Sequence, residues 1–166
     1  MKIRLAQPED CQAILDIYNE AILNSTATFD LEPQTLAARR QWLAEHNPAV
    51  YPVLCLLQEE KVVGWASLSP YRNRPAYRYS TEFSLYIHKD HRGRGYGRAL
   101  LRQLLAQAEA LGHHLLIACV ESSNTASLKL CGSLGFTYAG ELTEAGCKFN
   151  RWLNITFMQK ILSKKE

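Results

Sequence analysis

The chain has 166 residues, of which 47% are hydrophobic and 21% are charged, and its formal net charge at pH 7 is +3. These values are typical of a folded globular protein and exclude a disordered one, so we predict a single domain over residues 1–166. The small net charge does not indicate nucleic acid as a partner, and no apolar run is long enough to cross a membrane. Because the N-terminus also lacks the features of a signal peptide, we expect a cytoplasmic location.

Two periodicities alternate along the sequence and define its elements. Apolar residues at helical spacing predict helices over residues 11–23, 35–45, 97–111 and 125–134. Alternating or continuous apolar runs predict strands over residues 3–5, 52–57, 62–68, 79–87, 115–120, 138–142 and 152–159. We therefore predict an α/β (α+β) fold in which helices cover a mixed sheet.

Local signals mark the ends and the buried side of several predicted helices. Asp10 is a candidate N-cap for the first helix, and Gly112 and Gly135 are expected to end the third and fourth. The second helix is expected to be buried through Leu36 and Trp42.

The cysteine and histidine residues do not form a recognisable metal or disulfide pattern. The cysteines are odd in number, spread out and without a CxxC pair: Cys11, Cys55, Cys119, Cys131 and Cys147. A disulfide framework or a structural zinc site is therefore not indicated. The histidines also lack the spacing of metal ligands, so we predict no metal: His88, His91, His113 and His114.

The most informative segment is a glycine-rich turn between a strand and a helix, over residues 85–98. Backbone N–H groups and the positive end of the helix dipole converge at such a junction, which therefore binds phosphate. The segment has neither the Gly-Lys-Ser/Thr of a Walker loop nor a GxGxxG dinucleotide fingerprint. Its glycines allow an anion to approach the backbone closely and its arginines add positive charge: Gly93, Gly95, Gly97, Arg92, Arg94 and Arg98.

The sequence Arg92-Gly93-Arg94-Gly95-Tyr96-Gly97 resembles the Q/R-x-x-G-x-G/A signature of the GNAT acetyltransferase superfamily. The resemblance implies the GNAT fold, which is one mixed, largely antiparallel sheet of about seven strands with about four helices and a splayed strand pair at the acetyl-CoA site. It implies acetyl-CoA as co-substrate, with its pantetheine against Leu85, Tyr86 and Ile87. It also implies that the pyrophosphate is held by Arg92, Gly93, Arg94, Gly95, Tyr96, Gly97 and Arg98.

A second segment, residues 121–136, resembles the N-x-x-S…LGF part of the same family. The resemblance implies that Asn124 and Ser127 contact CoA, although Asn124 is also explained as a helix N-cap. Many members have a tyrosine seven residues after this asparagine, and one subgroup often has a histidine. Here the residue is Cys131, which is either a proton donor to the leaving thiolate or a buried structural thiol.

Further matches resemble the phosphinothricin acetyltransferase subgroup. Residues 80–87 resemble its T-x-E-x-S-x-Y-V strand, residues 146–152 its G-x-K-F-G-x-W segment, and residues 16–19 and 26–29 its first helix and loop. This subgroup acetylates the α-amino group of small amino-acid-like compounds such as phosphinothricin, methionine sulfoximine and methionine sulfone. The resemblance implies the same reaction here.

A general base is needed because an ammonium group must lose a proton before it attacks a thioester. Glu82 lies at the family's position for that base, and strand alternation puts it on one face with Ser84 and Tyr86. A backbone N–H near Leu85 or Tyr86 could stabilise the oxyanion. Acceptor binding is expected at five further residues, in which an arginine would clamp a carboxylate: Phe29, Arg72, Arg74, Tyr79 and Thr81.

Two other functions stay open, and one assembly is expected. The chain could acetylate a different amine, namely a polyamine, an aminoglycoside or a protein N-terminus, or it could bind CoA without turnover. The preferred partner is a small-molecule amine, and neither a membrane nor nucleic acid is expected as a partner. Relatives pair through their C-terminal strands, so we expect a homodimer formed around the apolar residues Phe149, Trp152 and Phe157.

Overall fold

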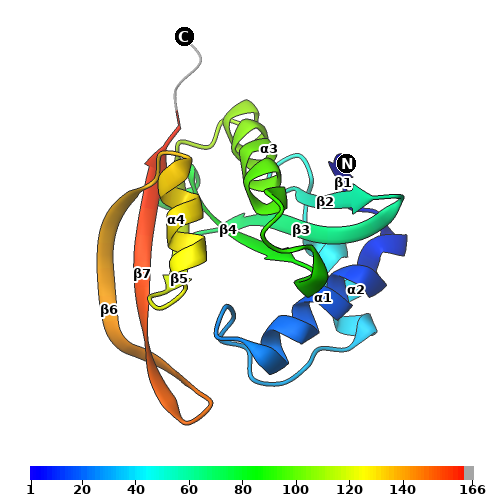
Figure 1. The fold of residues 1–166 in the computed structure, drawn as a ribbon. Coiled ribbons are helices and arrows are strands. Elements are labelled where there is room, and N and C mark those ends of the chain that lie inside the picture. The colour runs from blue at the N-terminus through cyan, green and yellow to red at the C-terminus, as the bar shows by residue number, and fades with distance from the viewer. Residues whose placement is uncertain (163–166) are drawn as a thin grey trace.

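The computed structural model describes residues 1–162, which form one seven-stranded sheet with helices on both faces (Figure 1). The strand order is β1-β2-β3-β4-β5-β7-β6, and all neighbours are antiparallel except β4 and β5. The strands are β1 (Lys2–Leu5), β2 (Val53–Gln58), β3 (Lys61–Pro70), β4 (Ser80–Ile87), β5 (Leu115–Glu121), β6 (Thr137–Lys148) and β7 (Arg151–Ile161). The helices are α1 (Cys11–Asn24), α2 (Leu36–Glu45), α3 (Tyr96–Ala110) and α4 (Thr125–Ser133).

The two faces of the sheet carry separate hydrophobic clusters. On one face α3 and α4 pack against β2 to β5, where the alternate residues Ala66, Leu116 and Ala118 meet Leu100 and Leu104 of α3. On the other face α1 and α2 cover β2 and β3, around the core residues Ile14, Ile17, Cys55, Leu57 and Trp65. The expected helices and strands and the mixed, largely antiparallel sheet are confirmed.

β4 and β5 pair over a short stretch and then diverge. Their register contains three pairs, the last being Glu82 opposite Ile117. Beyond them β4 continues beside β3 alone and β5 continues beside β7 alone. The backbone groups along the two inner edges of this gap have no strand partner, so they are free to bond a ligand lying between the strands. The expected splayed pair is thus present.

The β6–β7 hairpin is longer than the sequence pattern indicated, because β6 reaches Lys148 instead of ending at Leu142. Its turn consists of Phe149 and Asn150, both with positive φ, as a two-residue hairpin loop requires. The register shifts between Leu142 and Gly146, which marks a bulge in the strand. The bulge interrupts the alternation of apolar residues, so the sequence pattern does not predict the part of β6 that follows Leu142.

Two expectations about the N-terminal half were met only in part. Asp10 is the N-cap residue of α1, but its side chain makes no capping bond there; it accepts hydrogen bonds from the backbone N–H of Gln7 and from both terminal nitrogens of Arg4. In α2 the buried residue is Arg39, whereas Leu36 and Trp42 are only half buried. The Arg39 guanidinium lies over the rings of Tyr18, Trp42 and Trp65. Trp42 still packs against the core, edge-to-face on Trp65, so the stacked cation adds to the expected apolar contact.

Candidate active site

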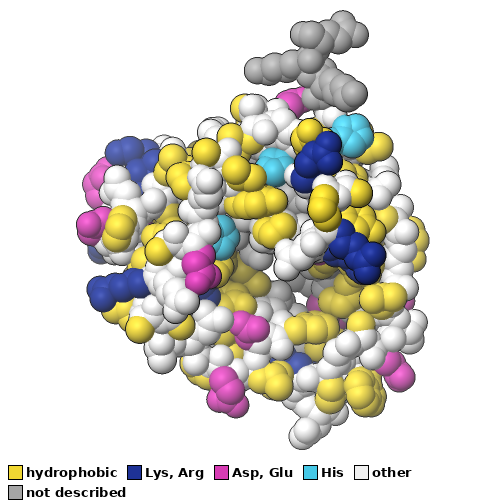
Figure 2. All heavy atoms as spheres, turned by 180° about the vertical axis from the view of Figure 1, so that it is seen from behind, with side chains coloured by type: hydrophobic (Ala, Val, Ile, Leu, Met, Phe, Trp, Pro, Cys, Tyr) yellow, Lys and Arg dark blue, Asp and Glu magenta, His cyan; other side chains and the backbone are white. Residues whose placement is uncertain are grey.

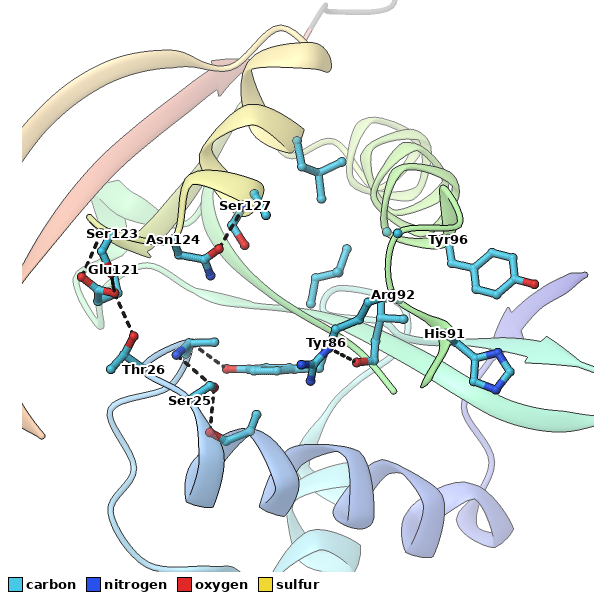
Figure 3. A pocket seen from close by; sticks show the side chains of 18 of the residues that line it. Ser25, Thr26, Tyr86, His91, Arg92, Tyr96, Glu121, Ser123, Asn124 and Ser127 are labelled. Atoms are coloured by element: carbon cyan, nitrogen blue, oxygen red, sulfur yellow. Dashed lines mark hydrogen bonds between the residues drawn. The ribbon is translucent and has the colours of Figure 1, made fainter. Parts of the chain in front are cut away.

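A pocket of about 470 Å³ lies where the end of α1, the inner edge of β4 and the first turns of α3 and α4 meet (Figure 3). Ten of the twelve residues expected to bind the cofactor line it: Leu85, Tyr86, Ile87, Arg92, Gly93, Gly95, Tyr96, Gly97, Asn124 and Ser127. Arg94 and Arg98 lie outside this lining, and Arg98 donates a hydrogen bond to Ser133 Oγ of α4 at 2.7 Å.

The glycine turn presents bare backbone to this pocket. Gly93 and Gly95 have φ of 75° and 79°, a conformation that favours glycine, and no atom would touch a Cβ at either position. Gly95 is the N-cap of α3 and offers no side-chain oxygen, so the first N–H groups of the helix have no side-chain cap. The turn therefore presents unsatisfied donors and a helix dipole to an anion.

Arg92 is held in place instead of being free to follow a ligand. Its Nε donates to the carbonyl of Ile87 at 3.0 Å, and its Nη2 pairs with Glu20 Oε2 at 2.7 Å. Asn124 has a similar double role, because its side chain accepts the N–H of Ser127 as an N-cap while it lines the pocket. Both residues fix the walls of the pocket as well as contributing polar atoms to it.

A smaller hollow of about 100 Å³ continues the pocket between the splayed strands. It shares residues of β4 and α4 with the larger pocket and extends to Cys119 and Cys131. Burial raises the pKa of the Cys131 thiol to about 11. Partial burial and the neighbouring Glu82 carboxylate raise the pKa of Cys119 to about 12. Both thiols are therefore protonated at neutral pH.

Glu82 lies at the base of the gap, at the last point of contact between β4 and β5, and is half buried. Burial raises the pKa of its carboxyl group, while a hydrogen bond from Cys119 and the charge of Arg72 lower it in part. Glu82 borders the hollow through Cys119 and is not itself among the lining residues. A carboxylate with a raised pKa is better suited to accept a proton near neutral pH.

A second carboxylate, Glu121, differs from Glu82 in its surroundings. It is buried and accepts hydrogen bonds from the N–H and Oγ of Ser123 and, at 2.8 Å, from Thr26 Oγ1 (Figure 3). Burial alone would raise the pKa of Glu121, but these hydrogen bonds outweigh it and lower the pKa. Glu121 is thus a structural anion that holds the loop after α1, and a poor proton acceptor.

The residues expected to bind the acceptor are dispersed. Arg72 and Arg74 are exposed, and only the charge of Arg72 acts on Glu82. Tyr79 is 52% exposed beneath the guanidinium of Arg78, and Phe29 is partly exposed in the loop after α1.

The expectation for Thr81 requires correction. Its side chain is fully buried and donates to the carbonyl of Ser69, so it joins β3 to β4 and cannot contact an acceptor. Strand alternation explains this result, because Thr81 lies on the opposite face from Glu82.

Three residues that line the pocket or the hollow were missed in the sequence, namely Thr26, Cys119 and Glu121, as was the contact that Lys148 makes with the loop after α1. Alternation along β5 could have found two of them, since Cys119 and Glu121 share a face with Ile117, the partner of Glu82. No local pattern indicates that Lys148 reaches the loop after α1. That contact joins residues 120 positions apart.

Figure 2 shows the face opposite to that of Figure 1. Its surface has a depression near the centre, which hydrophobic and acidic side chains border. Within residues 1–162, no three or more His, Cys, Asp or Glu side chains are grouped as metal ligands would be. The same range contains no helix with the length and apolar character of a transmembrane span.

Comparison with known proteins gives consistent matches along the chain. Residues 13–136 match the family model described as acetyltransferase (GNAT) family. The chain is 40% identical over 165 residues to the L-amino acid N-acyltransferase MnaT of Escherichia coli (strain K12), covering 99% of this chain and 96% of that protein. It is 40% identical over 159 residues to the L-methionine sulfoximine/L-methionine sulfone acetyltransferase of Salmonella typhimurium (strain LT2), covering 96% and 93%. The structure of the Salmonella typhimurium protein yncA with its cofactor acetyl-CoA has a TM-score of 0.96 at 39% identity, covering 100% of this chain and 96% of that chain.

Proposed function

We propose that this chain, which belongs to the acetyltransferase (GNAT) family, transfers the acetyl group of acetyl-CoA to the α-amino group of a small amino-acid-like compound. The observation that carries the proposal is the gap between β4 and β5, which joins the anion-binding turn at one end to Glu82 at the other. The names of the relatives support an amino acid, or a compound such as methionine sulfone or methionine sulfoximine, as the acceptor, and another relative, 38% identical, is a phosphinothricin N-acetyltransferase of Alcaligenes faecalis.

The residues of the larger pocket fit acetyl-CoA in charge and shape. The bare N–H groups of residues 93–97 suit a pyrophosphate, and the unpaired inner edge of β4 suits the amide groups of pantetheine. The acetyl thioester supplies the electrophilic carbonyl. With the pyrophosphate on the turn, the hollow beyond Leu85 is where that carbonyl belongs.

Glu82 is the general base of the proposal. Its raised pKa and its place beside the hollow favour it over Glu121, whose pKa is lowered by three hydrogen bonds. It takes the proton from the acceptor's ammonium group, directly or through a water molecule, and the free amine then attacks the thioester carbonyl. A backbone N–H on the unpaired edge of β4 near Leu85 or Tyr86 donates to the carbonyl oxygen as negative charge develops.

Arg72 is the stronger candidate for the acceptor's carboxylate, because its charge already acts on Glu82. Its guanidinium lies over the ring of Tyr71, 5.2 Å from the centroid, and is otherwise exposed to solvent. A guanidinium can hold a carboxylate by two parallel hydrogen bonds. Arg74, Tyr79 and Phe29 remain candidates for contacts with the rest of the acceptor.

An acceptor panel tests this function directly. CoA release from acetyl-CoA is measured with methionine sulfone, methionine sulfone amide, spermidine and a short peptide. We expect methionine sulfone to give the highest kcat/KM and its amide to show a KM raised by roughly tenfold or more, since a cation loses its partner. Preference for spermidine or the peptide would contradict the amino-acid assignment, and acetyl-CoA binding without release of CoA with any amine would contradict catalysis.

We further propose that the protein is a homodimer formed through the β6–β7 hairpin. Five large apolar side chains of this hairpin are more than half exposed: Tyr138, Leu142, Phe149, Trp152 and Ile161. Exposed apolar side chains gathered on one element are typical of a surface that is covered by a partner. Light scattering at micromolar concentration should give twice the 18.8 kDa mass of the chain, and a monomeric mass would contradict the proposal.

A further inference from the structure

Lys148 is a buried lysine that the proposed reaction does not use. Its side chain is 3% exposed, and its Nζ donates to the backbone carbonyl of Thr28 at 2.8 Å. Burial lowers the pKa of this amine, which shows that its surroundings disfavour the charge. The Lys148 Nζ lies 5.2 Å from the centroid of the adjacent Phe149 ring, and its hydrogen bond to Thr28 joins the hairpin to the loop after α1.

A second contact lies two residues earlier in the hairpin. Gly146 packs directly against the ring of Phe29, so closely that a Cβ at position 146 would overlap two ring carbons. The φ of Gly146 is not in the left-handed region, so close packing, not backbone conformation, requires a glycine here. Gly146 and Lys148 thus contact neighbouring residues of the same loop.

The bulge in β6 explains how the hairpin tip reaches this loop. Three residues, 143–145, occupy the space opposite Asn154, and Glu144 has a positive φ. The N–H of Glu144 donates to Asn154 Oδ1 at 2.8 Å, which fixes the bulge. A bulge bends its strand, and the bent tip of the hairpin meets the segment that follows α1.

The same loop forms part of the wall of the candidate active site. Ser25, Thr26 and Ala27 line the larger pocket, and Ala27 also lines the hollow between the strands. The loop is also held by other side chains: Thr26 donates to Glu121, Tyr18 Oη lies 2.9 Å from Thr28 Oγ1 and donates to Asp30, and Tyr86 donates to the carbonyl of Ala27. Lys148 adds a further anchor from the tip of the β6–β7 hairpin.

We propose that Gly146 and Lys148 are positioning residues that hold the loop of residues 25–30 as the acceptor-side wall of the active site. The inference rests on the proposed function, because it assigns this wall to the amine acceptor. Ser25, Thr26 and Ala27 line the pocket assigned to acetyl-CoA, but Lys148 and Gly146 contact Thr28 and Phe29, which do not line it, so acetyl-CoA affinity should depend little on the two residues. The acceptor should depend on them strongly, since a small displacement of the wall misplaces the amine.

The first test replaces Lys148 by methionine, which keeps an unbranched side chain and removes the donor. We expect the KM for methionine sulfone to rise by about tenfold or more, with acetyl-CoA Kd changed by less than about threefold. Amide hydrogen exchange within residues 26–30 should become faster, because the Thr28 carbonyl loses its donor. Lys61→Met, at an exposed lysine at the start of β3, is the matched control and should change none of these quantities.

The second test is a double-mutant cycle between positions 146 and 29. Gly146→Ala should raise the acceptor KM because the new methyl group displaces the Phe29 ring, and in a Phe29→Leu background the same change should have a much smaller effect. Additive effects of Gly146→Ala and Phe29→Leu would overturn the inference. An unchanged KM in Lys148→Met, or equal weakening of acceptor and acetyl-CoA, would also overturn it.

These outcomes are distinct from failure of the proposed function. If the wild-type protein acetylates no amino-acid-like compound, the proposed function is wrong. The inference that the loop of residues 25–30 forms the acceptor-side wall is then wrong as well. If the wild-type protein is active and Lys148→Met keeps its acceptor KM, the inference alone is wrong.

Discussion

The two ends of the candidate active site are built in different ways. The end that suits the pyrophosphate comes from one continuous segment, residues 85–97, with α4 beside it. The acceptor end is assembled from the loop after α1, the start of β4, the middle of β5 and the tip of the β6–β7 hairpin. A binding site made of backbone N–H groups needs only a local turn, whereas a site that orients a variable side chain needs walls from several elements.

The two ends also differ in their charged groups. At the turn, Glu20 and the carbonyl of Ile87 fix the Arg92 guanidinium. Its position at the pocket is therefore set before a ligand binds. At the acceptor end, two carboxylates have opposite pKa shifts, because Glu82 is partly desolvated while Glu121 is hydrogen-bonded. One end is therefore suited to binding an anion, and the other to transferring a proton.

The largest effect that separates the two ends is expected from Gly95→Asp. A carboxylate placed at the turn repels the pyrophosphate, so acetyl-CoA affinity should fall by roughly 100-fold, about 2.8 kcal/mol. Gly112→Asp is the matched control, because Gly112 also has a positive φ and open space for a Cβ but lies after the other end of α3. Calorimetry with acetyl-CoA measures both; equal affinities for the two variants would remove the phosphate assignment from the turn.

A smaller effect is expected from Cys131→Ala, inside the hollow. The pKa of this thiol is about 11. Proton transfer to an ordinary thiolate of pKa ~8.5 is therefore uphill by about 3 kcal/mol. We expect kcat to fall by less than about tenfold, since a thiolate leaves readily without a proton. Steady-state rates with saturating acetyl-CoA measure this, and a loss of a hundredfold or more with the fold intact would make Cys131 the essential acid.

The cofactor end could be predicted from the sequence because its signals are local. The strand, glycine turn and helix occur within fourteen consecutive residues, 85–98, and Asn124 and Ser127 begin the next helix. Arg94 and Arg98 were the exceptions, because neither lines the pocket and the Arg98 side chain donates a hydrogen bond to α4. The fold could be predicted for the same reason, because apolar residues recur in most strands with a period of two residues and in most helices with a period of 3.6 residues.

The acceptor end could be predicted only in part. Glu82 and Phe29 came from the resemblance to a family, and Thr81 was assigned to the wrong face although alternation with Glu82 places it in the core. Lys148 carried no local signal for its role, because a buried lysine is identified by a distant carbonyl and not by its neighbours in sequence. Likewise, the bulge that aims the hairpin tip breaks the pattern by which strands are recognised.

The central claim is that Glu82 accepts the proton of the amine, and the pH dependence of kcat/KM for the wild type and Glu82→Gln tests it most directly. Since the pKa of Glu82 is raised by burial, wild-type kcat/KM should fall as the pH decreases through a value above the usual carboxyl range. The acceptor's amine, with a pKa of roughly 8, gives its own fall in rate toward low pH, so the limb is assigned to Glu82 by its loss in Glu82→Gln, where the amine is unchanged. In Glu82→Gln we predict a kcat/KM lower by about 10²–10⁴-fold, a flattened acidic limb and an unchanged acetyl-CoA Kd. A variant with the wild-type rate and profile would contradict the claim, because the base would then be another group or bulk water.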